Sequence, residues 1–594
     1  MDFYGFYTGK IFDAYQFLGA HIEEEGVVFR TFAPNAKRIT LIGEFSKWQE
    51  MEMQKVHDGN FWECRVSDAK AGQMYKYRIY EKSGRCIDHC DPYGFGMELR
   101  PNNASIIRDM NYTFSDEKWM ANRSDCKTKP LNIYEVHFGS FRKPSEEEDA
   151  WYTYEEMADI LIPYLKELGY NYLEIMPLNE YPCDASWGYQ STGFFSPTSR
   201  YGSAEQLKYF VNQCHQNGIG VIMDFVPVHF AVDDYGLANY DGTALFEYPH
   251  SAVGVSEWGS CNFMHSRGEV RSFLQSVANY WIEEYHMDGL RMDAISRAIY
   301  WQGDPARGVN QNAVEFLRYM NQGLKAMHPS ILLAAEDSTS FAGVTKSVAE
   351  GGLGFDYKWD MGWMNDTLDY CRINAPYRSE NYHKLTFSMM YYYDDRFLLP
   401  LSHDEVVHGK ATIMQKMSGE YEEKFPQARA FYMYMYAHPG KKLNFMGNEI
   451  GQLREWDEKR EQDWDILKYP IHDGFHRFMR ALHRFYLEHP ALFEKDYDKD
   501  GFQWVDCHQE EKSIYAFERR GAKERIVVLF NFSNKEQSGY RFQVEHAEKI
   551  ERLLASNQTI YGGNDSRENV VLQAKEGWFE ATLPAYSAEY YVVR

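Results

Sequence analysis

The N-terminal part of the chain alternates between apolar and polar positions. Up to about residue 115, short runs such as those at residues 27–32 and 74–79 repeat this alternation, and turn-forming residues such as Asp58-Gly59 separate them. A period of two is typical of half-buried strands. We therefore expect residues 1–115 to form an N-terminal β-sandwich.

From about residue 116 to 490, helical and strand-like segments follow one another. Helical stripes at residues 157–168, 270–281 and 313–327 each precede a short apolar run, and Gly169 follows the first stripe as a helix terminator. Repeated helix–strand units with apolar strands indicate a parallel sheet. About eight such units favour a closed (β/α)8 TIM barrel, with a doubly wound open sheet as the alternative.

Two further segments complete the expected organisation. Residues 225–265 are rich in Gly, Asp and aromatic residues and too long for a plain connection, which predicts an insertion over the active face. From residue 491 to 594 the alternation returns, for example at residues 513–517 and 525–530. We therefore expect an α/β fold in which a barrel at 116–490 is flanked by the N-terminal and a C-terminal β-sandwich.

Four apolar runs in the barrel region end on a carboxylate. In chain order these residues are Asp224, Asp293, Glu336 and Asp404. Barrel strands present their carboxyl ends at the active face, and paired carboxylates are the groups that glycoside chemistry uses. The pattern predicts a glycosidase-type enzyme.

Asp293 and Glu336 end neighbouring candidate strands, so we expect them side by side. A retaining mechanism needs a nucleophilic and a protonated carboxyl about 5 to 5.5 Å apart. Arg291 lies two residues before Asp293 on the same strand face, where its charge should keep Asp293 ionised as the nucleophile. Glu336 has no basic residue nearby in sequence and follows an apolar run, which favours the protonated form of a general acid.

Composition limits the partners. With 63 Lys and Arg against 87 Asp and Glu, the net charge of −24 disfavours nucleic acid and anionic lipid but not a neutral glycan. No apolar stretch is long enough for a membrane span and no secretory signal is visible, so we expect a cytoplasmic protein without membrane contact. The nine cysteines are expected as thiols; Cys86 and Cys90 lack a second ligand pair, so we expect no metal site, and no cofactor is required.

At the carboxylate motifs the chain resembles glycoside hydrolase family 13, the α-amylase family, and within it the bacterial branching enzymes. The resemblance spans nearly the whole chain and is carried by residues 186–190, 224–229, 288–294, 333–339, 352–361, 401–410 and 445–451. It implies that Asp293 is the nucleophile, Glu336 the acid/base and Asp404 the third carboxylate, which stabilises the transition state.

The resemblance also implies substrate-binding roles. They concern Arg291, which orients the nucleophile, His229 and His403, which hydrogen-bond the reacting glucose, Asp224, which supports the site, and Tyr189, a stacking platform. The N-terminal region, through residues 18–21, 33–36 and 43–48, resembles the family 48 carbohydrate-binding module. In this region Trp48 and Trp62 are candidates for glucan stacking, with packing in the sandwich core as the alternative. Arg297, shortly after the nucleophile, departs from the commonest family pattern.

The function expected from this resemblance is chain transfer. Asp293 attacks an α-1,4 bond of a glucan such as amylose, amylopectin or glycogen, and a glucose 6-hydroxyl of another chain displaces it, forming an α-1,6 branch. A monomer is expected, with a homodimer as the alternative. A hydrolase of the same family, either an amylase or a debranching enzyme, shares the covalent intermediate and remains open. An inactive glucan-binding protein is the third alternative, although the three carboxylates are all present.

Overall fold

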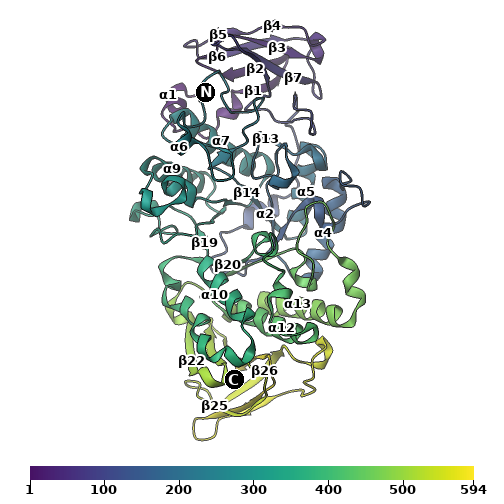
Figure 1. Cartoon of the computed structure of the whole chain (residues 1–594), viewed down its shortest axis with the longest axis vertical. Coiled ribbons are helices and arrows are strands. Elements are labelled where there is room, and N and C mark those ends of the chain that lie inside the picture. The colour runs from purple at the N-terminus through teal and green to yellow at the C-terminus, as the bar shows by residue number, and fades with distance from the viewer. The chain divides into compact units, whose positions relative to one another are not determined.

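The computed structural model describes residues 1–594, and Figure 1 shows its elements. The chain divides into two compact units: unit 1 contains residues 1–124, 142–162 and 174–356, and unit 2 contains residues 125–141, 163–173 and 357–594. None of the helices is both long and apolar enough to cross a bilayer.

Unit 1 begins with two antiparallel sheets, shown in purple in Figure 1. They consist of β1 (Gly19–Glu23), β2 (Gly26–Phe32), β6 (Phe61–Val66) and β5 (Gln54–Val56), and of β4 (Met51–Glu52), β3 (Arg38–Gly43), β7 (Met74–Tyr80), β8 (Cys86–His89) and β9 (Ser105–Ile106). Strand β7 shows the cause of the sequence pattern: Tyr75, Tyr77 and Ile79 are fully buried, whereas the residues between them are only partly buried. The predicted N-terminal β-domain is confirmed.

Eight strands close into a parallel barrel in chain order. They are β10 (Asn132–Val136), β11 (Tyr172–Ile175), β14 (Gly220–Phe225), β17 (Gly289–Met292), β18 (Leu332–Ala335), β19 (Tyr357–Trp359), β20 (Phe397–Leu401) and β21 (Lys441–Phe445). Every residue of these strands is buried, as expected for a parallel sheet whose outer face is covered by helices. The predicted TIM barrel is therefore confirmed, and the open-sheet alternative is wrong.

Long helices connect the strands. The principal ones are α4 (Tyr154–Leu168), α5 (Ala204–Gln216), α7 (Gly268–Tyr285), α9 (Gln311–Met327), α10 (Met361–Arg372), α12 (Tyr421–Ala437) and α13 (Pro470–Glu488). Helix α12 is buried from Gln427 to Ala437, so this stretch has no solvent-exposed face. The C-terminal domain covers it: Arg519 donates a hydrogen bond of 2.7 Å to the Ala437 carbonyl, and Arg429 donates one of 2.7 Å to the Ser556 carbonyl.

The segment expected as an insertion has little regular structure. It contains β15 (His229–Phe230), which pairs with β16 (Cys261–Asn262), and the short helix α6 (Ser251–Gly254). The pairing returns the segment to the end of β14, where site residues begin. Its length therefore places additional side chains beside this strand end.

The C-terminal domain of unit 2 consists of antiparallel strands. A six-stranded sheet orders β22 (Phe502–Gln509), β23 (Ile514–Arg520), β24 (Arg525–Asn531), β29 (Ser587–Val593), β26 (Lys549–Ala555) and β27 (Val571–Gln573), and a second sheet pairs β25 (Gln537–Phe542) with β28 (Phe579–Leu583). Side chains of both sheets, among them Val527, Phe542 and Phe579, form one buried core. The predicted C-terminal all-β domain is confirmed.

A buried ion-pair cluster connects the segment before the barrel to the N-terminal end of β17. His215 of α5 lies 2.7 Å from Asp116 through Nδ1 and 2.7 Å from Asp288 through Nε2, and His286 also contacts Asp116 at 2.8 Å. Burial opposes a charge on the His215 ring, but the two carboxylates outweigh burial and raise its pKa to about 9. His215 is therefore an imidazolium at neutral pH.

We expect this cluster to make stability fall in alkali. Because the pKa of His215 is raised from 6.5 to about 9, its contribution is complete below about pH 6.5 and is lost as the pH rises through 9. The pKa values of Asp116 and Asp288 are lowered, so their contribution is lost only in acid. Urea unfolding should lose up to about 3 kcal/mol from pH 6.5 to 9.5. The His215→Gln variant should be less stable at pH 6.5, and its free energy of unfolding should change less with pH. Equal slopes of this free energy against pH in the native protein and the variant would show that His215 is not the titrating group.

Candidate active site

One buried arginine in unit 1 binds three carboxylates. The Arg291 side chain is fully buried, and its Nη1 donates to Asp224 at 2.7 and 2.9 Å and to Asp293 at 3.0 Å. Its Nη2 donates to Glu336 at 2.5 Å. The Asp224 side chain is also buried, whereas those of Asp293 and Glu336 are partly exposed. The carboxylates that a ligand can reach are therefore Asp293 and Glu336.

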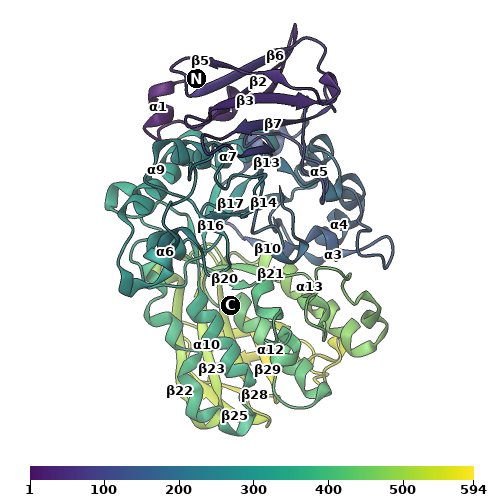
Figure 2. The ribbon, with the colours of Figure 1, turned by 45° about the horizontal axis from the view of Figure 1, so that its top comes forward.

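Strand register explains why these groups meet. In the parallel ladder, Asp224 on β14 lies opposite Arg291 on β17, and Arg291 lies opposite Ala334 on β18. Figure 2 shows β14 and β17 side by side. Opposed residues point to the same side of a sheet. Ala334 is small, so it leaves room for the guanidinium between the strands.

The ladder continues beyond the last strand residues. The Asp293 N–H donates to the Phe225 carbonyl at 2.9 Å, and the Glu336 N–H donates to the Met292 carbonyl at 3.1 Å. These bonds place Asp293 and Glu336 next to each other. The structure thus brings together the pair that the sequence predicted from neighbouring strand ends.

Ala294, which follows Asp293, has a left-handed backbone with a φ of 48°. This conformation is unfavourable for a residue with a Cβ. In this conformation the Ala294 N–H donates a hydrogen bond of 3.0 Å to Glu336 Oε2. The unfavourable backbone therefore gives a site carboxylate one more hydrogen-bond donor. Nothing in the sequence indicates this donor.

Competing effects act on the protonation of Asp293. Burial raises the pKa of Asp293 well above its ordinary range, the Arg291 guanidinium opposes this increase, and the neighbouring Glu336 adds to it. Glu336 has no basic residue nearby in sequence, but in the fold Arg291 reaches it from the adjacent strand. Arg291 therefore serves both carboxyls and does not by itself distinguish nucleophile from acid.

Tyr189 and His229 extend this group. The Tyr189 hydroxyl donates to Asp224, and the Arg291 guanidinium carbon lies 6.0 Å from the centre of its ring. His229 is buried, which lowers its pKa to about 4, and its Nδ1 lies 2.8 Å from the Ser260 hydroxyl. The ring is therefore neutral at pH 7 and can exchange hydrogen bonds with sugar hydroxyls. Ser260 was not among the candidates from sequence, because its partner lies 31 residues away.

In unit 2, Glu135 holds His403, the residue before the fourth candidate carboxylate, Asp404. Glu135 on β10 is fully buried and accepts the His403 backbone N–H at 3.0 Å and contacts its ring Nδ1 at 2.6 Å. His403 Nε2 lies 3.5 Å from Asp404, whose side chain is 43% exposed. Glu135 was not among the residues predicted from the sequence, although a charge inside an otherwise apolar barrel strand is a usable signal.

The two tryptophans proposed for glucan stacking differ in exposure. Trp62 is 4% exposed and its Nε1 donates to the Ala33 carbonyl at 3.0 Å, which corresponds to the core-packing alternative. Trp48 is 40% exposed and stays a candidate.

Asp116, His215 and His286 have the donor types of a metal site, and their ligand atoms lie within 4.8 Å of one another. Both ring nitrogens of His215 already contact carboxylates, and its raised pKa favours the protonated ring. A metal ligand must be deprotonated. This cluster therefore fits an ion pair better than a metal centre.

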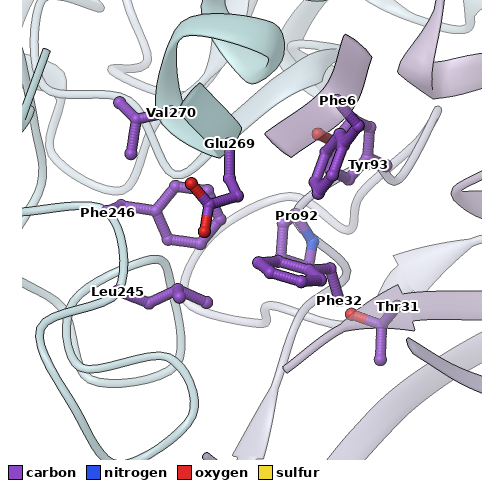
Figure 3. A pocket seen from close by; sticks show the side chains of 9 residues that line it. All are labelled: Phe6, Thr31, Phe32, Pro92, Tyr93, Leu245, Phe246, Glu269 and Val270. Carbon is purple, nitrogen blue, oxygen red and sulfur yellow. The ribbon is translucent and has the colours of Figure 1, made fainter. Parts of the chain in front are cut away.

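A separate pocket lies in unit 1 (Figure 3). It is lined mainly by apolar side chains, including Phe6, Phe32, Tyr93 and Phe246, with Glu269 as its one carboxylate. None of the residues around Arg291 lines it. A single carboxylate lacks the partner that glycoside cleavage needs.

Three family models match the chain. They are carbohydrate-binding module 48 (isoamylase N-terminal domain) at residues 17–94, the α-amylase catalytic domain at residues 157–237, and the α-amylase C-terminal all-β domain at residues 504–594. A putative α-amylase from Salmonella typhimurium has a similar fold, with a TM-score of 0.74 and 18% identity over 97% of this chain and 100% of that one. Fold and matched domains together define an α-amylase-type barrel protein.

Relatives of nearly the same length narrow this class. The 1,4-α-glucan branching enzyme GlgB of Fusobacterium nucleatum is 43% identical over 588 residues, covering 97% of this chain and 95% of that one. The GlgB of Geobacillus stearothermophilus is 42% identical over 591 residues, covering 98% and 92%. The chain therefore belongs to the GlgB family of 1,4-α-glucan branching enzymes.

We expect Glu135→Gln to reduce activity through His403. A glutamine keeps the shape of the side chain, but its NH2 group cannot accept, so either the backbone or the ring bond of His403 is lost. Turnover of amylose should fall roughly tenfold or more, with Glu135→Asp retaining more activity. Initial rates, with thermal unfolding as the control for folding, check this. If Glu135→Gln turns over amylose at the native rate, the contact between Glu135 and His403 only stabilises the fold.

Proposed function

We propose that this chain is a 1,4-α-glucan branching enzyme, which cleaves α-1,4 bonds and forms α-1,6 branches in glycogen. The near full-length similarity to GlgB proteins is the observation that carries the proposal. The carboxylates around Arg291 supply groups that this chemistry requires. The substrate is an α-glucan, and the carbohydrate-binding module match at residues 17–94 supports this class.

In the first step, the Asp293 carboxylate attacks the anomeric carbon of the donor glucose. The bond to the 4-oxygen of the next glucose breaks, and Glu336 gives its proton to that oxygen. The donor chain is then covalently attached to Asp293. In the second step, Glu336 takes the proton of a glucose 6-hydroxyl, whose oxygen displaces Asp293 and forms the α-1,6 bond.

The remaining residues bind and stabilise the reacting glucose. Arg291 compensates the charge of the buried carboxylates, and Asp224 holds both Arg291 and Tyr189. His229 and His403 hydrogen-bond sugar hydroxyls. Asp404, which follows β20, stabilises the positive charge that develops at the anomeric carbon.

The hydrolase alternative differs only in the group that displaces Asp293. Water in place of the 6-hydroxyl releases a reducing end from the same intermediate. From the sequence alone, we also propose that the protein is a cytoplasmic monomer and that it acts on amylose, amylopectin and glycogen.

Proton NMR of amylose incubated with the protein tests the proposed reaction. The α-1,6 anomeric signal should rise while reducing-end signals stay constant, because each cleaved bond is replaced by a branch. In Asp293→Asn the rate at which α-1,6 linkages form should fall about a thousandfold or more. The variant should still bind amylose. Growing reducing-end signals without α-1,6 linkages would instead identify a hydrolase.

The acid limb of the pH profile tests the Asp293 assignment. Because the pKa of Asp293 is raised, the nucleophile becomes protonated at a higher pH than a free aspartate, whose pKa is about 3.9. We expect kcat/KM to fall in acid with an apparent pKa above that value. Glu336→Gln removes a carboxylate that raises the pKa of Asp293, so the acid limb should move to lower pH.

This shift is measured with an α-maltooligosyl fluoride, whose leaving group needs no acid catalyst. Fluoride release by the native enzyme and by Glu336→Gln gives the two acid limbs. An unchanged or raised acid limb in the variant would contradict the proposed coupling of the two carboxyls.

A further inference from the structure

An exposed tryptophan lies directly beside the candidate site. Trp258, in the segment between α6 and β16, is 47% exposed. Its ring centre is 5.4 Å from that of His229, and the rings are inclined by 33°. A flat aromatic face at this position offers a stacking surface for the apolar face of a glucose ring.

The Trp258 backbone is fixed to two segments of the site. Gln190, which follows Tyr189, donates to the Trp258 carbonyl at 3.3 Å. The Trp258 N–H donates to Ser256 at 3.2 Å, and Ser256 contacts Ser260, the partner of His229. The loop that carries Trp258 is therefore continuous with the hydrogen bonds around His229.

Arg297 holds the loop from the other side. It lies four residues after Asp293, and its guanidinium carbon is 5.4 Å from the centre of the Trp258 ring. The same guanidinium pairs with Glu257 at 2.5 Å and donates to the Gln302 carbonyl at 3.1 Å. These contacts connect the nucleophile segment to the residue before Trp258 and to the ring itself.

The surrounding backbone is adapted to this arginine. A Cβ at Gly303 would lie 2.2 Å from Arg297 Nη1, and Gly303 has a φ of 71°, so glycine suits this position. The Gln302 side chain adds bonds of 3.0 and 2.9 Å to the carbonyls of Ala252 and Val255. Because the Arg297–Glu257 pair is exposed to water, it contributes little to stability. Positioning accounts for this set of contacts better than stabilisation does.

We propose that Trp258 is a stacking platform for a glucose unit of the α-glucan and that Arg297 is the positioning residue that holds it there. The inference rests on the proposed function, which supplies the glucan. A ring held in place before binding loses less conformational freedom when the sugar arrives. Arg297 thereby determines how strongly this enzyme holds a glucan at a position beside the reacting glucose.

Kinetics on amylose test the platform. Trp258→Ala should raise KM about tenfold while kcat changes less than twofold, since the ring contacts the sugar away from the breaking bond. Trp258→Phe should retain most of the affinity because it keeps an aromatic face. Arg297→Gln should raise KM about threefold, because the ring remains but is no longer held.

A double variant separates positioning from direct contact. If Arg297 acts through Trp258, then Arg297→Gln combined with Trp258→Ala should have the KM of Trp258→Ala alone. Trp578→Ala is the matched control: Trp578 is 39% exposed and Arg541 lies 5.1 Å from its ring centre, in the C-terminal domain. This control should leave KM unchanged.

The outcomes are distinguishable. A native KM in Trp258→Ala overturns the platform, and a double variant that multiplies the two single effects overturns the role of Arg297. An equal rise in KM in Trp578→Ala shows a general effect of surface tryptophans and also overturns the proposal. Absence of α-1,6 linkages in the native reaction rejects the proposed function itself, independently of these variants.

Discussion

The buried guanidinium of Arg291 is the constraint on which the site depends. A charge inside a barrel is costly unless carboxylates and hydrogen bonds compensate it, and Asp224, Asp293 and Glu336 do so here. The same contacts hold Asp293 and Glu336 next to each other. Removing Arg291 would leave acidic groups close together in a buried environment, so the arginine both organises the pair and limits its mutual repulsion.

The barrel makes this arrangement possible because neighbouring parallel strands share one register. Asp224, Arg291 and Ala334 lie opposite one another on β14, β17 and β18. Backbone hydrogen bonds continue past the strand ends to Asp293 and Glu336. A slip of one residue would turn these side chains to the other face of the sheet. The positions of these side chains are therefore fixed by the same backbone bonds that form the fold.

The sequence predicted the elements whose signal is local. Apolar runs ending on carboxylates identified the strands that carry Asp293 and Glu336, and alternation identified the flanking β-domains, although the exact domain boundaries stay predictions. Strand β19 has only three residues and gave no such signal. Sequence spacing also places Arg291 beside Asp293 but cannot reveal its contact with Glu336, 45 residues away. The bond between Glu135 and His403 spans 268 residues and depends on the closed fold.

We propose that Asp293 is the nucleophile of the carboxylate pair around Arg291. Mass spectrometry of Glu336→Gln treated with an α-maltooligosyl fluoride tests it most directly, because this variant retains the nucleophile but lacks the base that assists release. We expect a covalent maltooligosyl group on the peptide that contains Asp293, and none when Asp293→Asn is added. A sugar attached to another carboxylate in this variant would show that Asp293 is not the nucleophile.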